Sequence, residues 1–394
     1  MRRMSLLVAA TTFAAGCGGG GPLDGDGGGD PDAAIDPTAE VFDPDTIDTY
    51  ELTLSPASIA ALAADPRTYV RGDLRVGTYA LTNIGVRLKG EYNFRPLDRK
   101  AAFKLKFDEF VGGQTFHGLK RLTLNNSLED TSWVAERLTY HCFRAADLPA
   151  PRAASAWITV NGEPYGLYVA LETEDKRFLA RWFTDDSGNL YEEGMEDLLP
   201  GNEASFDLET NEAANDRSDL TALFAAIATA GDATFLADLA ATLDGPEFLR
   251  FCAYEAAVSQ WDGYCQTRFG PNNFRLYHDP STGHFHFIPW GMDMSWKPYE
   301  ATPLDPYDAR TVLFRGCLDS ASCRDAYAVE VRAAADHLES LNLPALVDAW
   351  GDQVRPLVAA DPRKEVDLDR FEETLAEVRA RAVARPAELR AAQP

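Results

Sequence analysis

Three polar residues in the segment 261–296 have the types and spacing that a phosphoryl-transfer site requires. Asp262 lies at the start of this segment, Asn273 near its middle and Asp293 near its end. Phosphoryl transfer asks mainly for positioning and charge neutralisation. One carboxylate that orients a hydroxyl, with an Asn and a second carboxylate that hold magnesium, would supply both. The alternative is an ordinary surface hairpin flanked by capping Asp residues, because Asp is common at turns.

A β-hairpin would bring these residues together. Phe274–Tyr277 and His284–Ile288 alternate apolar and polar residues, and the turn between them contains Asp-Pro and Gly. The open ends of the two strands meet on one side of the sheet. Asp262, Asn273 and Asp293 are therefore expected to converge there.

His284 and His286 put two imidazoles on one face of the second strand, because side chains alternate along a strand. No third ligand lies nearby in the sequence, and the cysteine spacing contains no CxxC pair. Structural zinc sites normally take four Cys or His ligands. We therefore expect no zinc site, and we expect both histidines to face solvent.

Composition restricts the class of protein. The 394-residue chain is 45% hydrophobic, enough for one large two-lobed unit or two domains, and no run after the N-terminus is long enough to span a bilayer. The formal net charge of −25 repels nucleic-acid phosphates, so we expect no nucleic-acid partner. Only eight basic residues are Lys, and five of them lie between residues 89 and 120, which favours a local need for compact ammonium groups.

The N-terminus resembles a bacterial lipoprotein signal, with two arginines before the apolar stretch Leu6–Ala15 and small residues before Cys17. We expect residues 1–16 to be a removed signal peptide, Cys17 to carry lipid, and residues 17–46 to form a flexible acidic tether of Gly, Asp and Pro. The resemblance implies an exported protein anchored to a membrane, in the periplasm or at the cell surface. A plain secretory signal is the alternative, because Ala14 stands where Leu is more usual.

An exported chain can form disulfides. Cys317 and Cys323 close a small loop in a polar segment and are the expected pair. Cys142, Cys252 and Cys265 then allow one further bridge at most. One thiol should stay unpaired and buried.

Secondary-structure signals predict an α+β protein with a β-rich part, residues 47–175, and a mainly helical part, residues 176–394. Strands are predicted at Tyr50–Leu54, Tyr69–Val76, Tyr79–Leu88, Ala102–Phe107, Trp157–Val160 and Tyr165–Leu171. Helices are predicted at Ala57–Ala64, 130–144, Arg177–Phe183, Leu220–Thr229, Ala233–Leu243, Pro246–Gln260, Ala326–Leu341, Leu343–Pro356 and Asp367–Ala387. The acidic stretch Asn189–Asn215 has little pattern and is predicted to be a surface insert.

Several charged residues in the β-rich part are candidates for phosphate binding. In Ala102–Phe107 the apolar side chains face one way, so Lys104 and Lys106 lie on the face away from the core. Glu136 lies on the helix that Asp130 or Thr131 is expected to cap. It is either a partner for a lysine or a solvated helix residue.

These motifs together resemble the spore coat protein H (CotH) kinase family over roughly Tyr50–Trp296. The resemblance is carried by Val86–Gly90, Lys100–Phe107, Leu122–Asn126 with Asp130, Val160–Gly162 with Tyr165–Tyr168 and Glu172, Asn272–Tyr277, and Pro289-Trp290 with Asp293. It implies an atypical protein-kinase-like fold with a β-rich N-lobe and a mainly helical C-lobe. It also implies transfer of phosphate from ATP to serine or threonine of surface or exported proteins, with Mg²⁺ as cofactor.

The resemblance assigns roles to the candidate residues. Asp262 would be the catalytic carboxylate, and Asn273 and Asp293 the magnesium ligands. The phosphate contact would be a lysine among Lys89, Lys100 and Lys104. Glu136, as a lysine partner, and Glu172, where a strand passes to a helix like the hinge between kinase lobes, complete the predicted ATP-binding set.

The sequence departs from the family and from ordinary kinases in three places. Gly291 stands where many relatives carry a second Asp, the interval from Asp262 to Asn273 is longer than the roughly five residues of ordinary kinases, and no GxGxxG loop precedes the lysines. ATP is also scarce outside the cytoplasm. Two other functions therefore stay open: a lipid-anchored surface scaffold on an inactive kinase-like fold, and a different metal-dependent enzyme that uses the same carboxylates.

Overall fold

The computed structural model describes residues 36–90, 93–297 and 303–394. The expected signal peptide, Cys17 and residues 17–35 of the expected tether lie outside the described residues. Within the described ranges, no helix is long and apolar enough to cross a membrane.

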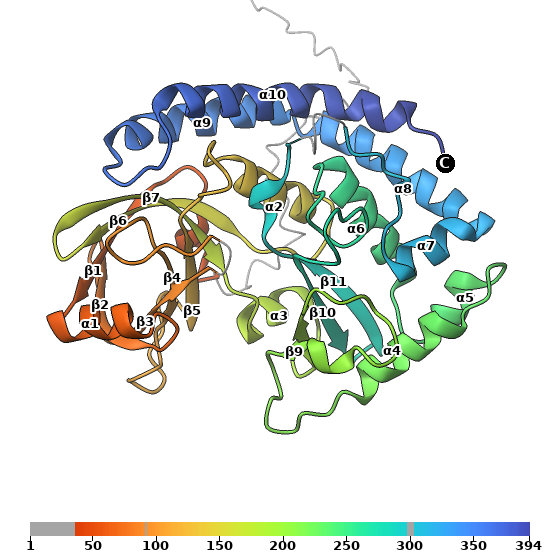
Figure 1. The fold of residues 1–394 in the computed structure, drawn as a ribbon, viewed down its shortest axis with the longest axis horizontal. Helices are drawn as coiled ribbons and strands as arrows, with labels where there is room; N and C mark the ends of the chain where they lie inside the picture. Colours follow the sequence, from red (N-terminus) through yellow and green to blue (C-terminus); the bar gives the residue numbers. More distant parts are fainter. Residues whose placement is uncertain (1–35, 91–92, 298–302) are drawn as a thin grey trace, which may run out of the picture. The chain divides into compact units, whose positions relative to one another are not determined.

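Seven strands form a closed barrel in the order β1-β2-β3-β4-β5-β7-β6, and β1 and β6 pair in parallel (Figure 1). The strands are β1 (Asp48–Leu54), β2 (Val70–Val76), β3 (Tyr79–Lys89), β4 (Ala102–Lys106), β5 (Arg121–Asn125), β6 (Ala153–Val160) and β7 (Glu163–Glu172). Buried and exposed residues alternate strictly along β2, as expected for a strand with one face in a core. The inward side chains form one apolar cluster that fills the barrel.

The remaining chain adds a four-stranded sheet, β11-β10-β8-β9, and most of the helices. Its strands are β8 (Leu190–Glu192), β9 (Asp207–Leu208), β10 (Phe274–Asp279) and β11 (His284–Pro289). The helices are α1 (Pro56–Ala64), α2 (Ala135–Ala145), α3 (Lys176–Trp182), α4 (Ser218–Thr229), α5 (Phe235–Leu239), α6 (Gly245–Ala257), α7 (Val312–Asp319), α8 (Ala321–Ser340), α9 (Leu343–Ala360) and α10 (Leu368–Ala391), and the 3₁₀ turns are η1 (Ala39–Phe42), η2 (Glu203–Ser205) and η3 (Met292–Met294). The α+β class is confirmed.

The predicted hairpin of segment 261–296 is confirmed because its signals are local. Strands β10 and β11 pair with Phe274 opposite Pro289 and Asp279 opposite His284. The Asn161-Gly162 turn joins β6 to β7 with positive φ at both residues, as a tight hairpin requires.

Several helix boundaries differ from the prediction, and α7 was not predicted. Helix α2 begins at Ala135, after an irregular stretch in which Ser132 Oγ accepts a hydrogen bond from Ala135 N at 3.1 Å. Asp130 still accepts a hydrogen bond from the first turn of α2, from Glu136 N to Asp130 Oδ2 at 3.1 Å. Helix α5 is only five residues long, and α7 carries no sequence signal that we recognised.

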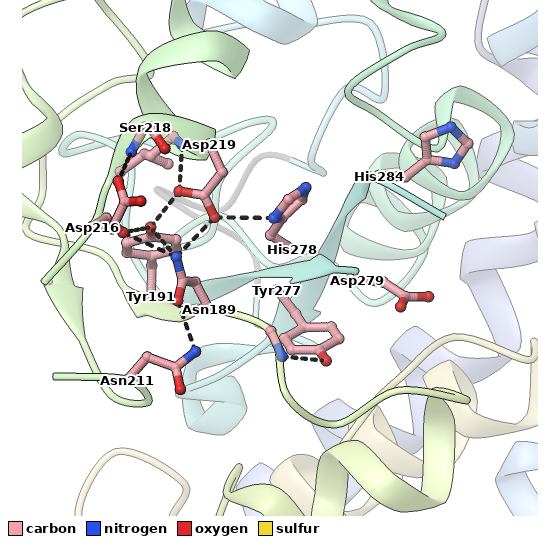
Figure 2. Close-up of polar contacts among 12 residues, drawn as sticks. Asn189, Tyr191, Asn211, Asp216, Ser218, Asp219, Tyr277, His278, Asp279 and His284 are labelled. Carbon is pink, nitrogen blue, oxygen red and sulfur yellow. Dashed lines mark hydrogen bonds and ion pairs between the residues drawn. The ribbon is translucent and has the colours of Figure 1, made fainter. Parts of the chain in front are cut away.

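The prediction of a surface insert at Asn189–Asn215 is wrong. Strands β8 and β9 within it extend the hairpin sheet, and Tyr191 and Phe206 are buried in the main core. Figure 2 shows how Asp219, in the first turn of α4, ties this segment to the sheet. Its carboxylate accepts from Tyr191 Oη at 2.6 Å and contacts His278 Nδ1 at 3.1 Å. Short strands without alternation give too little pattern to recognise.

The expected tether also ends earlier than residue 46. Val41 and Phe42 in η1 are buried in the barrel core, and Arg152 binds the Asp36 carboxylate at 2.8 Å. These contacts place residues 36–46 within the folded unit, because burial of two apolar side chains offsets the entropy of ordering a short segment.

Two disulfides are present. Cys317 pairs with Cys323, as predicted, and Cys252 pairs with Cys265. Cys142 is a free, buried thiol, as expected for the one cysteine left over. The second bridge connects α6 to the loop that carries Asp262.

Lys100 forms a buried ion pair with Asp361, which follows α9. Lys100 Nζ and Asp361 Oδ2 lie 2.5 Å apart, and the two side chains are 1% and 0% exposed. Asp361 also accepts from Leu167 N of β7 at 2.9 Å, and Gly166 leaves no room for a Cβ beside its carboxylate. Helices α9 and α10 run side by side, and α9 packs on β7 (Figure 1). The pair therefore joins the C-terminal helices to the barrel.

We expect Asp361→Asn to lower the free energy of unfolding by about 3–5 kcal/mol, because it leaves the Lys100 ammonium buried without a counter-charge. Chemical denaturation of both proteins measures the difference. The double variant Lys100→Met/Asp361→Asn should cost less than the sum of the two single variants. A loss below about 1 kcal/mol for Asp361→Asn would show that the pair does not hold the helices.

Candidate functional site

Hydrogen bonds to the Glu255 side chain hold the loop that carries Asp262. This buried carboxylate, on α6, accepts hydrogen bonds from Tyr264 N at 2.9 Å and from Cys265 N at 2.6 Å. A Cβ on Gly263 would lie 2.2 Å from Glu255 Oε1, so only glycine fits there. Cys265 also forms the disulfide with Cys252. Together these contacts fix the backbone that follows Asp262.

Asn273 contacts Asp262 directly. Asn273 Nδ2 donates to Asp262 Oδ2 and to the Asp262 carbonyl, both at 2.8 Å. The neighbouring Asn272 adds a longer bond to Asp262 Oδ1 at 3.4 Å. Asn273 has a positive φ of 57°, a conformation that Asn adopts more readily than most residues other than Gly. Residues 263–272 therefore form a loop whose two ends lie in contact. Asp262 and Asn273 converge as the sequence predicted.

Asp293 follows β11 in the turn η3, after Trp290 and Gly291. Gly291 has a φ of 59°, and a Cβ there would lie 2.1 Å from Asn273 Oδ1. An Asp at this position would displace the Asn273 side chain. Glycine at position 291, where many relatives carry Asp, thus allows the Asn273 side chain to lie against the backbone.

Glu136 and Lys89 lie on the barrel side of the same site. Glu136 is fully buried and accepts from Asn125 Nδ2 at 2.9 and 3.1 Å, so the solvated alternative is wrong. Lys89, the last residue of β3, is close enough for its charge to lower the pKa of Glu136. Its Nζ lies 5.2 Å from the centre of the Trp290 ring. We call Glu136, Asp262 and Asp293, with Asn273 and Lys89, the carboxylate cluster.

Negative groups outnumber positive groups in the carboxylate cluster. Burial, and then the charge of Asp293, raise the pKa of Glu136 well above its usual range. Burial likewise raises the pKa of Asp262, and Asp293 adds to this, against the hydrogen bonds from the two asparagines. One ammonium faces three carboxylates here. A divalent cation with a preference for oxygen ligands fits this donor set, because it would relieve the mutual repulsion of the acids.

Three of the predicted ATP-binding residues lie outside the carboxylate cluster. Lys100 pairs with Asp361, as described. Glu172 is buried in ion pairs with Arg152 at 2.7 Å and Arg181 at 2.6 Å; burial opposes them, but these charges lower its pKa overall. Lys104 lines a separate cavity of about 240 Å³, where burial lowers its pKa to about 8.

The expectation that His284 and His286 face solvent is wrong for His286. It is 7% exposed, and its Nδ1 lies 2.9 Å from Glu247 Oε1. With Asp244 these two residues form the one His, Cys, Asp and Glu group in the described ranges whose ligand atoms all lie within 4.8 Å of one another. Asp244 Oδ1 caps Glu247 N at 3.0 Å, so hydrogen bonds at the start of α6 account for the arrangement.

Sequence reasoning missed two supporting residues. Glu193, in the segment taken for an insert, accepts from Asn273 N at 3.1 Å, and burial raises its pKa to about 7. Asn125 orients Glu136. The Leu122–Asn126 motif was the signal that could have pointed to Asn125, whereas nothing in the low-pattern segment singles out Glu193.

Comparison with known proteins gives one family match, described as CotH kinase protein, over residues 86–389. The match extends beyond the expected range and includes α7 to α9 and most of α10. The chain is 25% identical over 281 residues to the inner spore coat protein H of Bacillus subtilis (strain 168), which covers 67% of this chain and 75% of that protein. An inner spore coat protein H-like protein of the same organism is 27% identical over 107 residues, covering 24% of this chain and 33% of the relative.

Proposed function

This chain belongs to the CotH kinase protein family, and from that premise we propose that it is an ATP- and magnesium-dependent protein kinase that phosphorylates serine or threonine of surface or exported proteins. The observation that carries the proposal is the contact between Asn273 and Asp262 beside Asp293 and Glu136. In this contact the Asp262 carboxylate, which would orient the acceptor, lies next to oxygen atoms that could bind a metal. Negative groups outnumber positive groups at this site.

In this proposal the acceptor hydroxyl oxygen attacks the γ-phosphorus of ATP, and the bond from that phosphorus to the oxygen bridging the β- and γ-phosphates breaks. ADP leaves, and Asp262 takes the hydroxyl proton. The two asparagine bonds hold the Asp262 carboxylate in one orientation, and Glu255 holds the loop beneath it. The chain thus supplies positioning, which is most of what this reaction requires.

Asn273 and Asp293 would hold Mg²⁺ through side-chain oxygens. The Asn273 Nδ2 donates to Asp262, which leaves its Oδ1 as the oxygen for a cation. Held there, magnesium would supply the positive charge that offsets the charge of the phosphates. Lys89, paired electrostatically with Glu136, would contact a phosphate as a point charge.

We further propose that the barrel and the helical part act as the two lobes of a kinase-like fold, with the β7–α3 connection as the hinge. The nucleotide would extend from the carboxylate cluster into the cavity lined by Lys104. Glu172, held by two arginines, would fix the hinge rather than contact ATP, and Lys100 would stabilise the fold.

A thermal-shift titration with Mg-ATP tests the proposal first. A ligand that binds only the folded state raises the melting temperature further as its concentration rises above Kd, with magnesium alone and EDTA-treated ATP as controls. Transfer of radiolabel from ATP to serine-rich acidic and basic proteins then tests the reaction. If the wild type neither binds Mg-ATP nor transfers label, the surface-scaffold function replaces this proposal.

The proposed location is outside the cytoplasm, with the protein held to a membrane through lipid on Cys17. The named relative is a spore coat protein, which supports a surface location. The acidic Gly-, Asp- and Pro-rich residues after Cys17 contain little apolar surface that would bind a membrane by itself.

Cys17→Ser should therefore move the protein from the membrane fraction to the soluble fraction, because the lipid is the expected anchor. Immunoblots of fractionated cells measure the distribution, with Cys142→Ser as a control that keeps Cys17. An unchanged membrane fraction for Cys17→Ser would show that the protein is held in another way.

A further inference from the structure

A cavity of about 240 Å³ is lined by residues of strands β3, β4 and β5 of the barrel, of strands β8 and β10 of the second sheet, and of the connection that follows β7. It is lined in part by Arg87, Lys104, Thr173, Glu174 and Arg275. It shares wall residues, Glu174 among them, with a larger hollow of about 510 Å³.

Trp290 connects this cavity to the carboxylate cluster. The Lys89 ammonium lies 5.2 Å from the centre of the Trp290 ring, and the Arg275 guanidinium 5.3 Å. One aromatic side chain thus contacts a cation of the carboxylate cluster and a cation of the cavity. The carboxylate cluster and the cavity are therefore neighbouring sites on two sides of the Trp290 ring.

Glu174 is the unusual residue in the cavity wall. Its side chain is fully buried, and neither carboxyl oxygen accepts a hydrogen bond. Its nearest cation is Arg275, with Nε 3.4 Å from Glu174 Oε2, and Arg275 Nε and Nη1 also lack acceptors. Buried polar atoms in folded proteins are nearly always hydrogen-bonded, so these oxygens call for a donor from a ligand.

The chemistry of the wall restricts that ligand. Arg87 and Lys104 add positive charge to the wall, whereas Arg275 is paired with Glu192, also in the wall, at 3.2 Å, and the Glu174 oxygens require N–H or O–H donors. Burial raises the pKa of Glu174 to about 8, although Arg275 acts against it. At neutral pH the carboxyl would then offer one acceptor beside one donor. The edge of an aminopurine presents the complementary pair, an amino N–H beside a ring nitrogen.

We propose that Glu174 determines base specificity by accepting a hydrogen bond from the exocyclic amino group of the bound purine nucleotide. This inference rests on the proposed ATP-dependent function and adds the part of ATP that the cavity recognises. Sites that hydrogen-bond a substrate N–H reject the analogue that lacks it, because their buried polar atoms are left unpaired.

The test compares ATP with purine riboside triphosphate, which lacks the 6-amino group, by calorimetry on the full chain with magnesium. Wild type should bind ATP about tenfold or more tightly, a usual effect of losing one such hydrogen bond. Glu174→Leu should bring the two affinities to within about threefold. Glu174→Asp keeps a carboxyl group but withdraws it by one methylene, and it should reduce the preference in the same way if the Leu variant does not fold. Glu163→Gln, an exposed change on β7, should keep the wild-type preference.

The outcomes separate the two proposals. If wild type binds ATP and the folded Glu174 variants keep the full preference, this inference is wrong and the kinase proposal stands. Equal loss of both nucleotides in a folded variant also overturns it, because Glu174 would then support the cavity only. If wild type binds neither nucleotide, the kinase proposal itself fails, and this inference fails with it.

Discussion

Asp262→Asn is expected to lower phosphate transfer by about 10²-fold or more while the Kd for Mg-ATP stays near the wild-type value. A general base contributes about 10²–10⁴-fold, and an amide cannot take the acceptor proton. The substitution keeps the shape of the side chain, and its carbonyl can still accept from Asn273 Nδ2. Binding by calorimetry and transfer by radiolabel measure the two effects separately.

The exposed residue Asp232 provides a matched control, because Asp232→Asn makes the same charge change away from the site. It should leave both binding and transfer unchanged. Wild-type transfer by Asp262→Asn would make Asp262 a loop cap. Joint loss of binding and transfer would instead assign it to the metal or the nucleotide.

Asp293→Asn should weaken Mg-ATP binding and phosphate transfer together. A neutral amide would leave the metal under-neutralised, and loss of a partner in a metal site typically costs about 10–100-fold in affinity. Binding of ATP in EDTA should change far less than binding of Mg-ATP, since only the metal contact is altered. The same two assays, with magnesium varied, measure this difference.

A result in which Asp293→Asn binds Mg-ATP like wild type would remove Asp293 from the metal set. Asn273 and Glu136 would then be the remaining oxygen ligands to test. Because Asp293 and Asp262 differ in which assay changes, the two variants together distinguish metal binding from proton transfer.

Residues near one another in sequence were predicted well. The β10–β11 hairpin depends on a few adjacent side chains, so its pattern is complete in the sequence. The convergence of Asp262 with Asn273 follows from that hairpin. The Cys317–Cys323 pair was also predicted correctly, since the two cysteines lie six positions apart in the sequence.

Burial of charged residues was predicted poorly. His286 was expected in solvent and Glu136 was left undecided, yet both are buried because neighbouring elements cover them. Alternation along one strand or helix shows which face is apolar but not whether a second layer covers the other face. The segment 189–215 was misread because its strands depend on pairing with other strands, β8 with β10 and β9 with β8.

The sequence alone determined the family, the α+β class, the hairpin and the chemical types that meet at Asp262, because local patterns and ordered motifs carry that information. Only the tertiary structure shows which groups surround each of the three candidate lysines. Lys100 pairs with Asp361, 261 residues away, Lys104 lines a cavity, and Lys89 remains beside Glu136. Three lysines in similar strand contexts differ only in what the distant chain places beside them. Ion pairing and desolvation act through space, so no spacing in the sequence distinguishes them.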